Sequence, residues 1–340
     1  MKVFGNLVGL AISASLLTAV PALAQDKVIG VAAIDLQNPW FVRMKESADV
    51  AAGDYGVTTT WQSAEANLEK QISIVESFIN QKVDAILIDP LDKNALLPVI
   101  TKAKDAGIPV VTMGNHVKGD WNHSTLYPDD ADLRVVAKAL GKSLDGKGQV
   151  ALLVGTRGNF VSDTREKAFK ETLAEEFPDI ELVGVQPTDW NTTKAATAAE
   201  TWLSTYPDLK AIACISDSMC LAANTVAEAL GRDIVFAGDN GDAEMMPLVE
   251  SGKMIITVLT SPQYVGYWNM SVGARLANGS EFPEALYMKT YYIMSDATAA
   301  ALKEKGLDID YITPEEALVE ADNVKEPLGP QQPDSAMTSQ

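Results

Sequence analysis

Ten polar or aromatic residues of this sequence stand just after short apolar segments, where together they could bind a small molecule. They are Asn38, Trp40, Phe41, Asp89, Asn115, Arg165, Trp190, Ser216, Asn240 and Thr260. The rings offer flat apolar faces, and the amide, carboxylate, hydroxyl and guanidinium groups offer hydrogen bonds. This combination suits a ligand with an apolar face and a polar rim, such as a sugar or a polyol.

The stretch 34–46 shows how such residues would be positioned, because it follows the apolar, β-rich segment 27–34. Asn38 is a favourable N-cap and Pro39 suits the first helical position, so a helix is predicted to start here. Trp40 and Phe41 would then lie at the carboxyl end of the strand, where ligands bind in open α/β sheets. The same residues are also typical of a capped helix with two core aromatics.

Several of the other positions also have a purely structural explanation. Asp89 precedes a proline and fits a turn, and Trp190 fits loop packing. Asp217 and Asn240 fit helix caps. Capping alone does not explain why so many of these residues follow strands. We therefore expect them at one end of two sheets.

Strands and helices alternate from residue 27 onward, which predicts an α/β fold with parallel sheets and crossover helices. Strands are predicted at 27–34, 57–62, 84–89, 108–113, 124–127, 149–154, 180–185, 209–215, 234–237, 254–259 and 287–293. Helices are predicted from Pro39 and at 68–81, 92–105, 162–177, 193–206, 219–230 and 263–278. A further helix, capped by Asp129 or Asp130, ends near Leu144. It follows a break at 124–128, where we expect the first crossing between two domains.

Residues 1–24 are predicted to be a secretory signal peptide and are excluded from the fold. Lys2 precedes an uncharged apolar run over 7–20, and Ala22-Leu23-Ala24 forms a cleavage site. The run is shorter than the roughly 20 residues that span a bilayer. No cysteine lies near the cleavage site, so we expect no lipid anchor on an N-terminal cysteine. We expect a soluble, exported protein in the periplasm of a Gram-negative cell.

The composition limits the classes of partner. The 340 residues are enough for two domains, and 47% hydrophobic and 21% charged residues are typical of a globular protein. The formal net charge is -19, and no basic patch stands out. Nucleic acid, anionic lipid and polyanions are therefore unfavourable partners. The acidity mainly favours solubility and does not forbid a cationic ligand.

The chain has two cysteines and two histidines. Cys214 falls on a predicted strand and Cys220 early in the next helix. Because strand and helix diverge around the turn between them, we expect two buried thiols. A disulfide is the alternative, which export to an oxidising compartment allows. His116 and His123 lack the spacing of metal ligands and are expected in loops, so no metal site is predicted.

Motifs for catalysis are missing from the sequence. The first predicted strand is not followed by G-x-G-x-x-G, and the chain has no Walker A sequence and no G-x-S-x-G elbow. Both histidines fall in one predicted loop, which disfavours a Cys or Ser nucleophile with a His base. We expect neither an enzyme nor a cofactor.

Several segments carry a family resemblance. They are Asn38-Pro39-Trp40-Phe41, residues 84–90, residues 106–111, Asp163-Thr164-Arg165 and residues 237–241. As a set, with the signal peptide, they resemble the periplasmic substrate-binding proteins of sugar ABC transporters, in particular the ribose-binding-protein-like branch. The resemblance covers roughly residues 27–310.

The resemblance implies a type I periplasmic binding protein: two Rossmann-like lobes, three crossings and a ligand in the interlobe cleft. One lobe would comprise residues 25–127 and 256–288, and the other residues 128–255 and 289–323. Residues 324–340 would form a loosely ordered tail. Closure of the lobes around the ligand would bury the binding groups.

The resemblance also implies roles for the ten residues. Trp40 or Phe41 would stack on one face of a sugar, and Trp190 on the other. Arg165 would donate a planar fork of N–H groups to ring or hydroxyl oxygens. The groups that bind ligand hydroxyls would be Asn38, Asp89, Ser216 and Asn240. The expected set of ten is completed by Asn115 and Thr260.

Two positions depart from the family pattern. Sugar binders of this branch usually carry an Asp-Arg pair after the fourth strand, where this chain has Gly114-Asn115. They often have an aspartate before the glycine of a later loop, where this chain has Asn240. Charge-assisted hydrogen bonds are about twice as strong as neutral ones. A short polyol or an atypical sugar therefore gains weight over a standard pentopyranose.

The expected function is capture of a small polyhydroxylated ligand by a monomeric, non-catalytic protein that delivers it to an inner-membrane ABC permease. The same fold could bind a signalling furanone or an amino acid, with Arg165 as carboxylate clamp and Asp89 or Asp217 as ammonium site. Presentation of the ligand to a chemoreceptor or kinase is compatible with transport. A related repressor is disfavoured, because the signal peptide takes the place of a helix-turn-helix.

Overall fold

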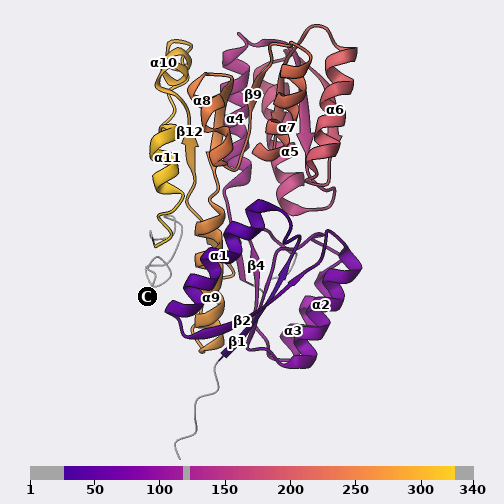
Figure 1. The fold of residues 1–340 in the computed structure, drawn as a ribbon, viewed down its shortest axis with the longest axis vertical. Helices are drawn as coiled ribbons and strands as arrows, with labels where there is room; N and C mark the ends of the chain where they lie inside the picture. The colour runs from indigo at the N-terminus through magenta and orange to yellow at the C-terminus, as the bar shows by residue number, and fades with distance from the viewer. Residues whose placement is uncertain (1–26, 118–122, 326–340) are drawn as a thin grey trace, which may run out of the picture.

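The polypeptide crosses three times between two α/β lobes, which are stacked along the long axis of the molecule (Figure 1). This computed structural model describes residues 27–117 and 123–325. The predicted signal peptide and residues 326–340 of the predicted tail lie outside the described residues.

The first lobe is built on a six-stranded sheet in which all neighbouring strands are parallel. In sheet order its strands are β11 (Ala285–Tyr287), β5 (His123–Leu126), β4 (Val110–Met113), β3 (Ala85–Ile88), β1 (Lys27–Ala33) and β2 (Val57–Ser63). The apolar run of β3 is buried along its whole length, as expected of a parallel strand covered on both faces.

The second lobe has a six-stranded sheet that is parallel except for the antiparallel pair of β10 and β12. Its strands are, in order, β12 (Tyr291–Ile293), β10 (Met254–Leu259), β9 (Val235–Ala237), β8 (Leu209–Cys214), β6 (Lys147–Val154) and β7 (Asp179–Pro187). Each sheet has its own hydrophobic core.

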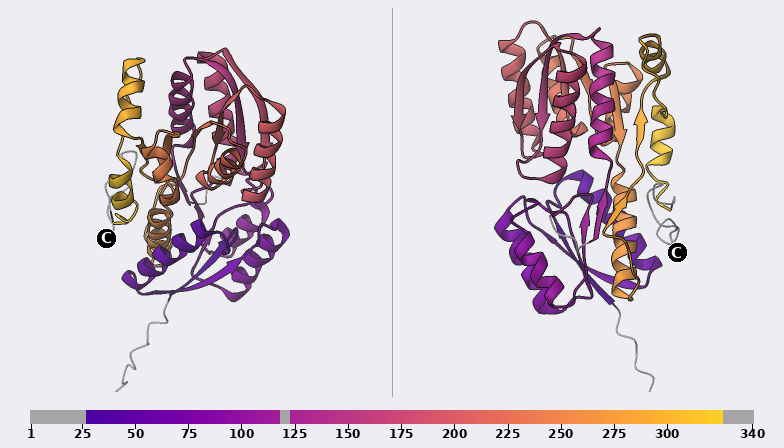
Figure 2. Two further views of the ribbon diagram at one scale, coloured as in Figure 1. Left: turned by 45° about the horizontal axis from the view of Figure 1, so that its top comes forward. Right: turned by 180° about the vertical axis from the view of Figure 1, so that it is seen from behind.

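Helices cover both faces of each sheet (Figures 1 and 2). In the first lobe they are α1 (Pro39–Asp54), α2 (Leu68–Gln81), α3 (Leu97–Asp105) and α9 (Pro262–Ala277). In the second lobe they are α4 (Asp129–Ser143), α5 (Phe160–Glu176), α6 (Thr192–Thr205), α7 (Asp217–Ala229), the short η1 (Ala243–Met245) and α8 (Met246–Glu250), α10 (Asp296–Glu304) and α11 (Pro314–Glu320).

Helices α1 and α9 pack closely because of one glycine. A Cβ atom at Gly266 would lie 2.0 Å from the carbonyl oxygen of Met44. Only glycine lets the two backbones approach this far. The close packing fixes α1, whose first turn carries Trp40 and Phe41.

Each of the three crossings joins an element of one lobe to an element of the other. The first crossing (residues 127–128) joins β5 to α4, and the second (260–261) joins β10 to α9. The third crossing (288–290) joins β11 to β12. The first was expected near this place. Since β10 lies wholly in the second sheet, the expected boundary between residues 255 and 256 is wrong and moves beyond Leu259.

Some local predictions are also wrong. The single strand expected at 287–293 is two strands in different sheets, because the aromatic and apolar run gives no sign of the break. The helix expected at 92–105 begins at Leu97, since the Asp92 carboxylate accepts hydrogen bonds from the amides of Asn94 and Ala95 and forms a turn. His123 begins β5 instead of lying in a loop.

The first turn of α4 also differs from the prediction. Neither Asp129 nor Asp130 caps the helix, because Pro128 occupies the N-cap position. Asp129 instead turns toward Arg165. The short helices η1, α8, α10 and α11 were not predicted.

Candidate functional site in the interlobe cleft

A cavity with a volume of about 380 Å³ lies between the two lobes. This volume is in the range of small-molecule sites. The structure brings all ten predicted site residues to its wall: Asn38, Trp40, Phe41, Asp89, Asn115, Arg165, Trp190, Ser216, Asn240 and Thr260. They meet because the carboxyl ends of the parallel strands in both sheets face the cleft.

Two aromatic rings of the first lobe form one wall. The Asn38 side chain accepts a hydrogen bond from the Trp40 amide at 2.9 Å and caps α1, as predicted. The rings of Trp40 and Phe41 are 5.0 Å apart and meet edge to face. Within the described residues, the buried indole Nε1 of Trp40 has no hydrogen-bond partner. It is therefore a donor that a ligand oxygen could satisfy.

Asp89 supplies a carboxylate to the floor of the cavity at the end of β3. The Gln71 side chain holds this turn, because Nε2 donates to the Asp89 carbonyl at 2.6 Å and Oε1 accepts from the Leu91 amide at 2.9 Å. The Asp89 carboxylate itself accepts one long hydrogen bond, 3.3 Å from Asn115 Nδ2. Burial raises the pKa of Asp89 to about 7. A ligand hydroxyl that donates to Asp89 would replace the water it has lost.

Trp190 enters the cavity from the second lobe. The backbone of Asp189 and Trp190 is left-handed, with φ of 54° and 59°. Such conformations are strained in residues other than glycine and often mark functional sites. The indole lies over Gly155, where a Cβ would be 2.3 Å from the ring. The turn and the glycine together fix the ring at the cavity wall.

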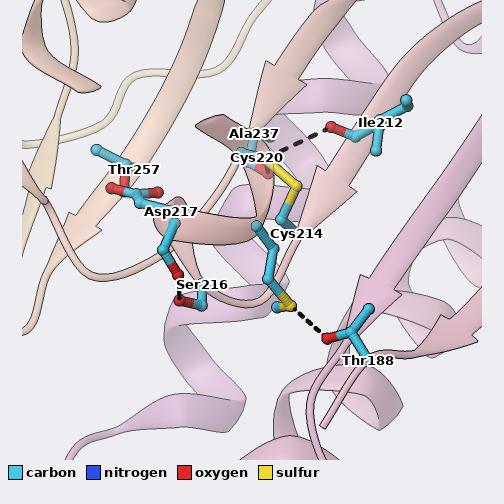
Figure 3. Close-up of a disulfide and its surroundings, with 10 residues drawn as sticks. Thr188, Ile212, Cys214, Ser216, Asp217, Cys220, Ala237 and Thr257 are labelled. Atoms are coloured by element: carbon cyan, nitrogen blue, oxygen red, sulfur yellow. Dashed lines mark hydrogen bonds between the residues drawn. A yellow bond between two sulfur atoms is a disulfide. The ribbon is translucent and has the colours of Figure 1, made fainter. Parts of the chain in front are cut away.

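Ser216 lies between β8 and α7, next to a disulfide (Figure 3). The structure joins Cys214 to Cys220, with 5.6 Å between their Cα atoms, so the expectation of two free thiols is wrong. Although strand and helix diverge, the last residue of the strand and the first turn of the helix remain within bonding range. The disulfide closes the turn that carries Ser216 and Asp217.

Asp217 lines the cavity but serves mainly to hold its wall. Both of its carboxylate oxygens accept from Thr257 Oγ1 at 2.9 Å, and one accepts from the Asp242 amide at 3.1 Å. It is fully buried and is not a helix cap. Burial and the nearby Asp242 carboxylate raise its pKa well above the usual range.

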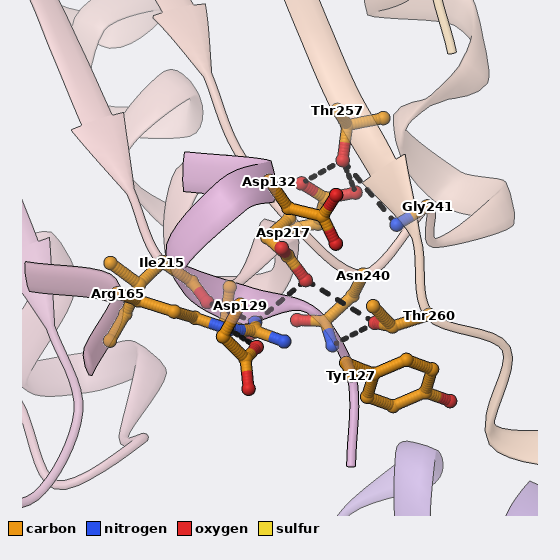
Figure 4. A network of polar contacts seen from close by, with 12 residues as sticks. Tyr127, Asp129, Asp132, Arg165, Ile215, Asp217, Asn240, Gly241, Thr257 and Thr260 are labelled. Carbon is orange, nitrogen blue, oxygen red and sulfur yellow. Dashed lines mark hydrogen bonds and ion pairs between the residues drawn. The ribbon is translucent and has the colours of Figure 1, made fainter. Parts of the chain in front are cut away.

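Asn240 and Thr260 meet at the end of the second sheet (Figure 4). Asn240 Nδ2 donates to Thr260 Oγ1 at 3.2 Å, and the Asn240 amide donates to the Val258 carbonyl at 2.9 Å. Asn240 also has a positive φ of 124°. This backbone geometry places its side chain at the cavity, and it is not a helix cap.

Arg165 lines the cavity, but much of its guanidinium is already bound (Figure 4). Nε lies 2.6 Å from Asp129 Oδ1, and Nη1 lies 2.6 Å from Asp239 Oδ1. Nη1 also donates to the Ile215 carbonyl at 2.9 Å. Burial alone would lower the pKa of Arg165, but the two carboxylates raise it, so the side chain stays charged. The free fork expected from the sequence is therefore reduced to part of the group.

Sequence reasoning missed the contacts that bridge the lobes beside the cavity. Arg43 of α1 pairs with Asp242 of the second lobe at 3.1 Å. Lys93, after β3, pairs with Asp163 of α5 at 2.5 Å, and its amide donates to the Gly158 carbonyl at 3.2 Å. These contacts join the two lobes directly. Such pairs have no local sequence signal, because they form between residues about 70 to 200 positions apart.

Neither a metal site nor a membrane-spanning helix is found in the part of the chain that the structure describes. No group of three or more His, Cys, Asp or Glu side chains there is arranged to hold a metal ion. No helix among these residues has the length and apolar character needed to cross a membrane.

The family model described as "Periplasmic binding protein domain" matches residues 29–281. This span is most of the chain and includes all ten predicted site residues. The chain belongs to the periplasmic binding protein family. The expected two-lobed α/β fold is confirmed, and the periplasm is the location that the family implies.

Relatives of this periplasmic binding protein include two with named ligands. The ribose import binding protein of Bacillus subtilis is 29% identical over 239 residues, 70% of this chain and 77% of that protein. The xylitol-binding protein of Mycolicibacterium smegmatis is 28% identical over 298 residues, 86% of this chain and 82% of that protein.

A solved structure of a solute-binding protein has a similar fold. The crystal structure of an ABC transporter periplasmic solute binding protein from Actinobacillus succinogenes 130z, with bound D-allose, is 25% identical. It superposes with a TM-score of 0.73, over 80% of this chain and 99% of that chain.

Proposed function

We propose that this periplasmic binding protein captures a small sugar or polyol in the interlobe cavity and delivers it to an inner-membrane ABC permease. The observation that carries the proposal is that aromatic rings of both lobes, Trp40 and Trp190, line the same cavity together with many polar groups. Flat apolar faces bind the C–H faces of a sugar or polyol, and the rim binds its hydroxyls. The named ligands of the relatives support the same class.

The charges of the cavity disfavour an anionic ligand. Six carboxylates line it, against two arginines. One arginine, Arg43, pairs with Asp242, and the other, Arg165, is held by Asp129 and Asp239. Sugar acids and sugar phosphates would therefore meet net repulsion.

An amino acid is a weaker candidate for the same reason. Its carboxylate would need a free guanidinium, but Arg165 already pairs with two buried carboxylates. A third anion would compete with these ion pairs in a water-poor site, which is costly. Asp89 alone could bind an ammonium group, but that would be half of an amino acid site.

The protein would be exported before it acts, and it would act by closure of the lobes around its ligand. Residues 1–24 would direct the chain to the periplasm and be removed, and the mature protein would act as a monomer without catalysis. Presentation of the loaded, closed form to a chemoreceptor would use the same lobe closure. The Arg43–Asp242 and Lys93–Asp163 pairs would form when the ligand draws the lobes together.

A thermal-shift screen with titration calorimetry on the hits tests the proposal. The library contains tetritols, pentitols, inositols, pentoses, hexoses and the twenty amino acids. A ligand at a hundredfold excess over Kd should stabilise the protein by about 2.7 kcal/mol. A shift confined to one family of sugars or polyols, and strongly reduced in Trp190→Ala, is the expected result. A shift with amino acids alone would contradict the proposal.

A further inference from the structure

Four charged residues form a buried cluster between the cavity and the three crossings. They are Asp129, Asp132, Arg165 and Asp239, and we call them the buried charge cluster. Their exposed fractions are only 0% to 3%. Arg165 alone of the four lines the cavity. The other three extend from it toward the segments that join the lobes.

The carboxylates of this cluster are bonded to the second and third crossings. Thr260 Oγ1, in the second crossing, donates to Asp239 Oδ1 at 3.3 Å. Thr290 Oγ1, in the third, donates to Asp132 Oδ1 at 3.3 Å. The Tyr292 hydroxyl, in the strand that follows, donates to the same oxygen at 3.0 Å.

The first crossing is connected to the buried charge cluster through the first residue of α4. Asp129 directly follows Pro128 and pairs with Arg165 at 2.6 Å. The hydroxyl of Tyr127, in the first crossing, donates to the carbonyl of Ser261, in the second, at 3.3 Å. All three crossings therefore end on one small set of side chains at the base of the second lobe.

The charges in the cluster do not balance, since it holds three carboxylates and one guanidinium, which pairs with Asp129 and Asp239. One oxygen of each carboxylate, Oδ2 of Asp129, Asp132 and Asp239, has no hydrogen-bond partner among the described residues. Burial and, after it, the Asp129 charge raise the pKa of Asp132, while the hydrogen bonds from Tyr292 and Thr290 and the Arg165 charge oppose the rise. The balance of these effects is a pKa of about 7. The ionisation of Asp132 thus depends on residues it does not touch.

We propose that the three carboxylates are positioning residues, which join Arg165 in the cavity to all three crossings and make hinge stiffness depend on the charge of the whole cluster. A ligand group bound to Arg165 would change that charge balance and thereby the stiffness of each crossing. In this respect the inference rests on the proposed function and deepens it. The coupling itself needs no ligand and is tested without one.

Hydrogen–deuterium exchange of the ligand-free protein provides the test. The segment to follow is 288–293, the third crossing with β12, because neither Arg165 nor Asp239 is bonded to it. Arg165→Met removes the only cation of the buried charge cluster, so Asp132 should become neutral and its hydrogen bonds to Thr290 and Tyr292 should weaken. Exchange in 288–293 is then expected to become several-fold faster.

Asp239→Asn has the opposite expected effect at the same segment. It removes a neighbouring negative charge while keeping the shape and the acceptor for Thr260, so Asp132 should ionise more readily. Its hydrogen bonds should strengthen, and exchange in 288–293 should slow several-fold. Asp130→Asn is the matched control, because Asp130 lies in the same helical turn but pairs with Arg134 at the surface. It should leave this segment unchanged.

A purely structural role for the cluster would make both variants looser and speed exchange in both. The proposal is overturned if the two variants do not shift 288–293 in opposite directions. Where Arg165→Met does not fold, Asp239→Asn decides alone: slower exchange supports the proposal, and unchanged or faster exchange overturns it. Neither outcome depends on which small molecule binds, so failure of the proposed function would be seen separately.

Discussion

The indole of Trp190 lies on the bare backbone of Gly155, at a distance where no other residue type would fit behind it. A Cβ at position 155 would be 2.3 Å from the ring, which is far inside van der Waals contact. The position of an aromatic wall of the cavity is thus set by the absence of a side chain on a neighbouring strand end.

This relationship gives the first prediction. Gly155→Ala should push the Trp190 ring toward the cavity and weaken ligand binding by about tenfold, the equivalent of 1.4 kcal/mol. Gly53→Ala is the control, because a Cβ there meets nothing within 4 Å. Titration calorimetry with the ligand from the screen measures both. Equal affinity in Gly155→Ala and the wild type would show that the ring does not contact the ligand.

Removal of the ring itself should have a larger effect. Trp190→Ala is expected to raise Kd by roughly thirtyfold, because about 2 kcal/mol of apolar burial and stacking is lost. The side chain is only partly buried in the second core, so the melting temperature should change little. Trp190→Phe keeps a flat ring and should recover most of the affinity. Unchanged binding in Trp190→Ala would remove this residue from the site.

The ion pair between Lys93 and Asp163 predicts an effect on closure. Lys93→Met should raise Kd by about fivefold, since a partly exposed pair contributes roughly 1 kcal/mol and this one joins the two lobes, so that opening of the lobes would break it. Lys102→Met, which breaks a pair with Glu76 inside the first lobe, is the control and should leave Kd unchanged. Small-angle scattering of the ligand-bound protein should show a larger radius of gyration for Lys93→Met. An identical radius and Kd would mean that the pair does not favour closure.

Asp132 predicts a pH dependence of stability. Burial raises its pKa from 3.8 to about 7 on folding. Between these values the folded protein holds a proton that the unfolded chain has lost, so the free energy of unfolding falls as pH rises from about 4 to 7. The Asp132→Asn variant has no titratable group at this position. It should match the wild type near pH 4 and exceed it above pH 7, by at most about 4 kcal/mol.

Chemical denaturation at several pH values measures this difference. Other buried acids, such as Asp89 and Asp239, keep part of the slope in the variant. The decisive quantity is therefore the difference between the two proteins. A constant difference from pH 4 to 8 would contradict the prediction.

The disulfide predicts sensitivity to reductant. Cys214 and Cys220 are six positions apart, and closing so short a loop contributes about 2 kcal/mol in the chain-entropy model. Dithiothreitol should lower the melting temperature of the wild type by a few degrees. The double variant with alanine at both positions controls for other effects and should not respond. If dithiothreitol also leaves the melting temperature of the wild type unchanged, the bond is not formed in solution.

The sequence allowed much of the cavity to be predicted because strand ends are local features. A polar residue after an apolar strand, such as Asp89 or Ser216, is visible without any knowledge of the partner strands. Parallel topology then brings all such ends to one place. The cap at Asn38 was equally local, and the structure shows the predicted hydrogen bond.

The features that were missed depend on partners far along the chain. Nothing near Arg165 shows that Asp129 and Asp239 would occupy its guanidinium, or that Arg43 would reach Asp242. The break between β11 and β12 is set by sheet pairing and not by a turn residue. The disulfide was misjudged because average directions of strand and helix say little about the first turn.

The bond between Cys214 and Cys220 makes the structure of the cavity wall depend on oxidation of the chain. The turn that carries Ser216 and Asp217 is covalently closed only after two electrons have been removed from the thiols. A newly made chain in a reducing cytosol would have this wall open, and oxidation after export would complete it. Maturation of the binding site would then coincide with arrival in the compartment where its ligand is found.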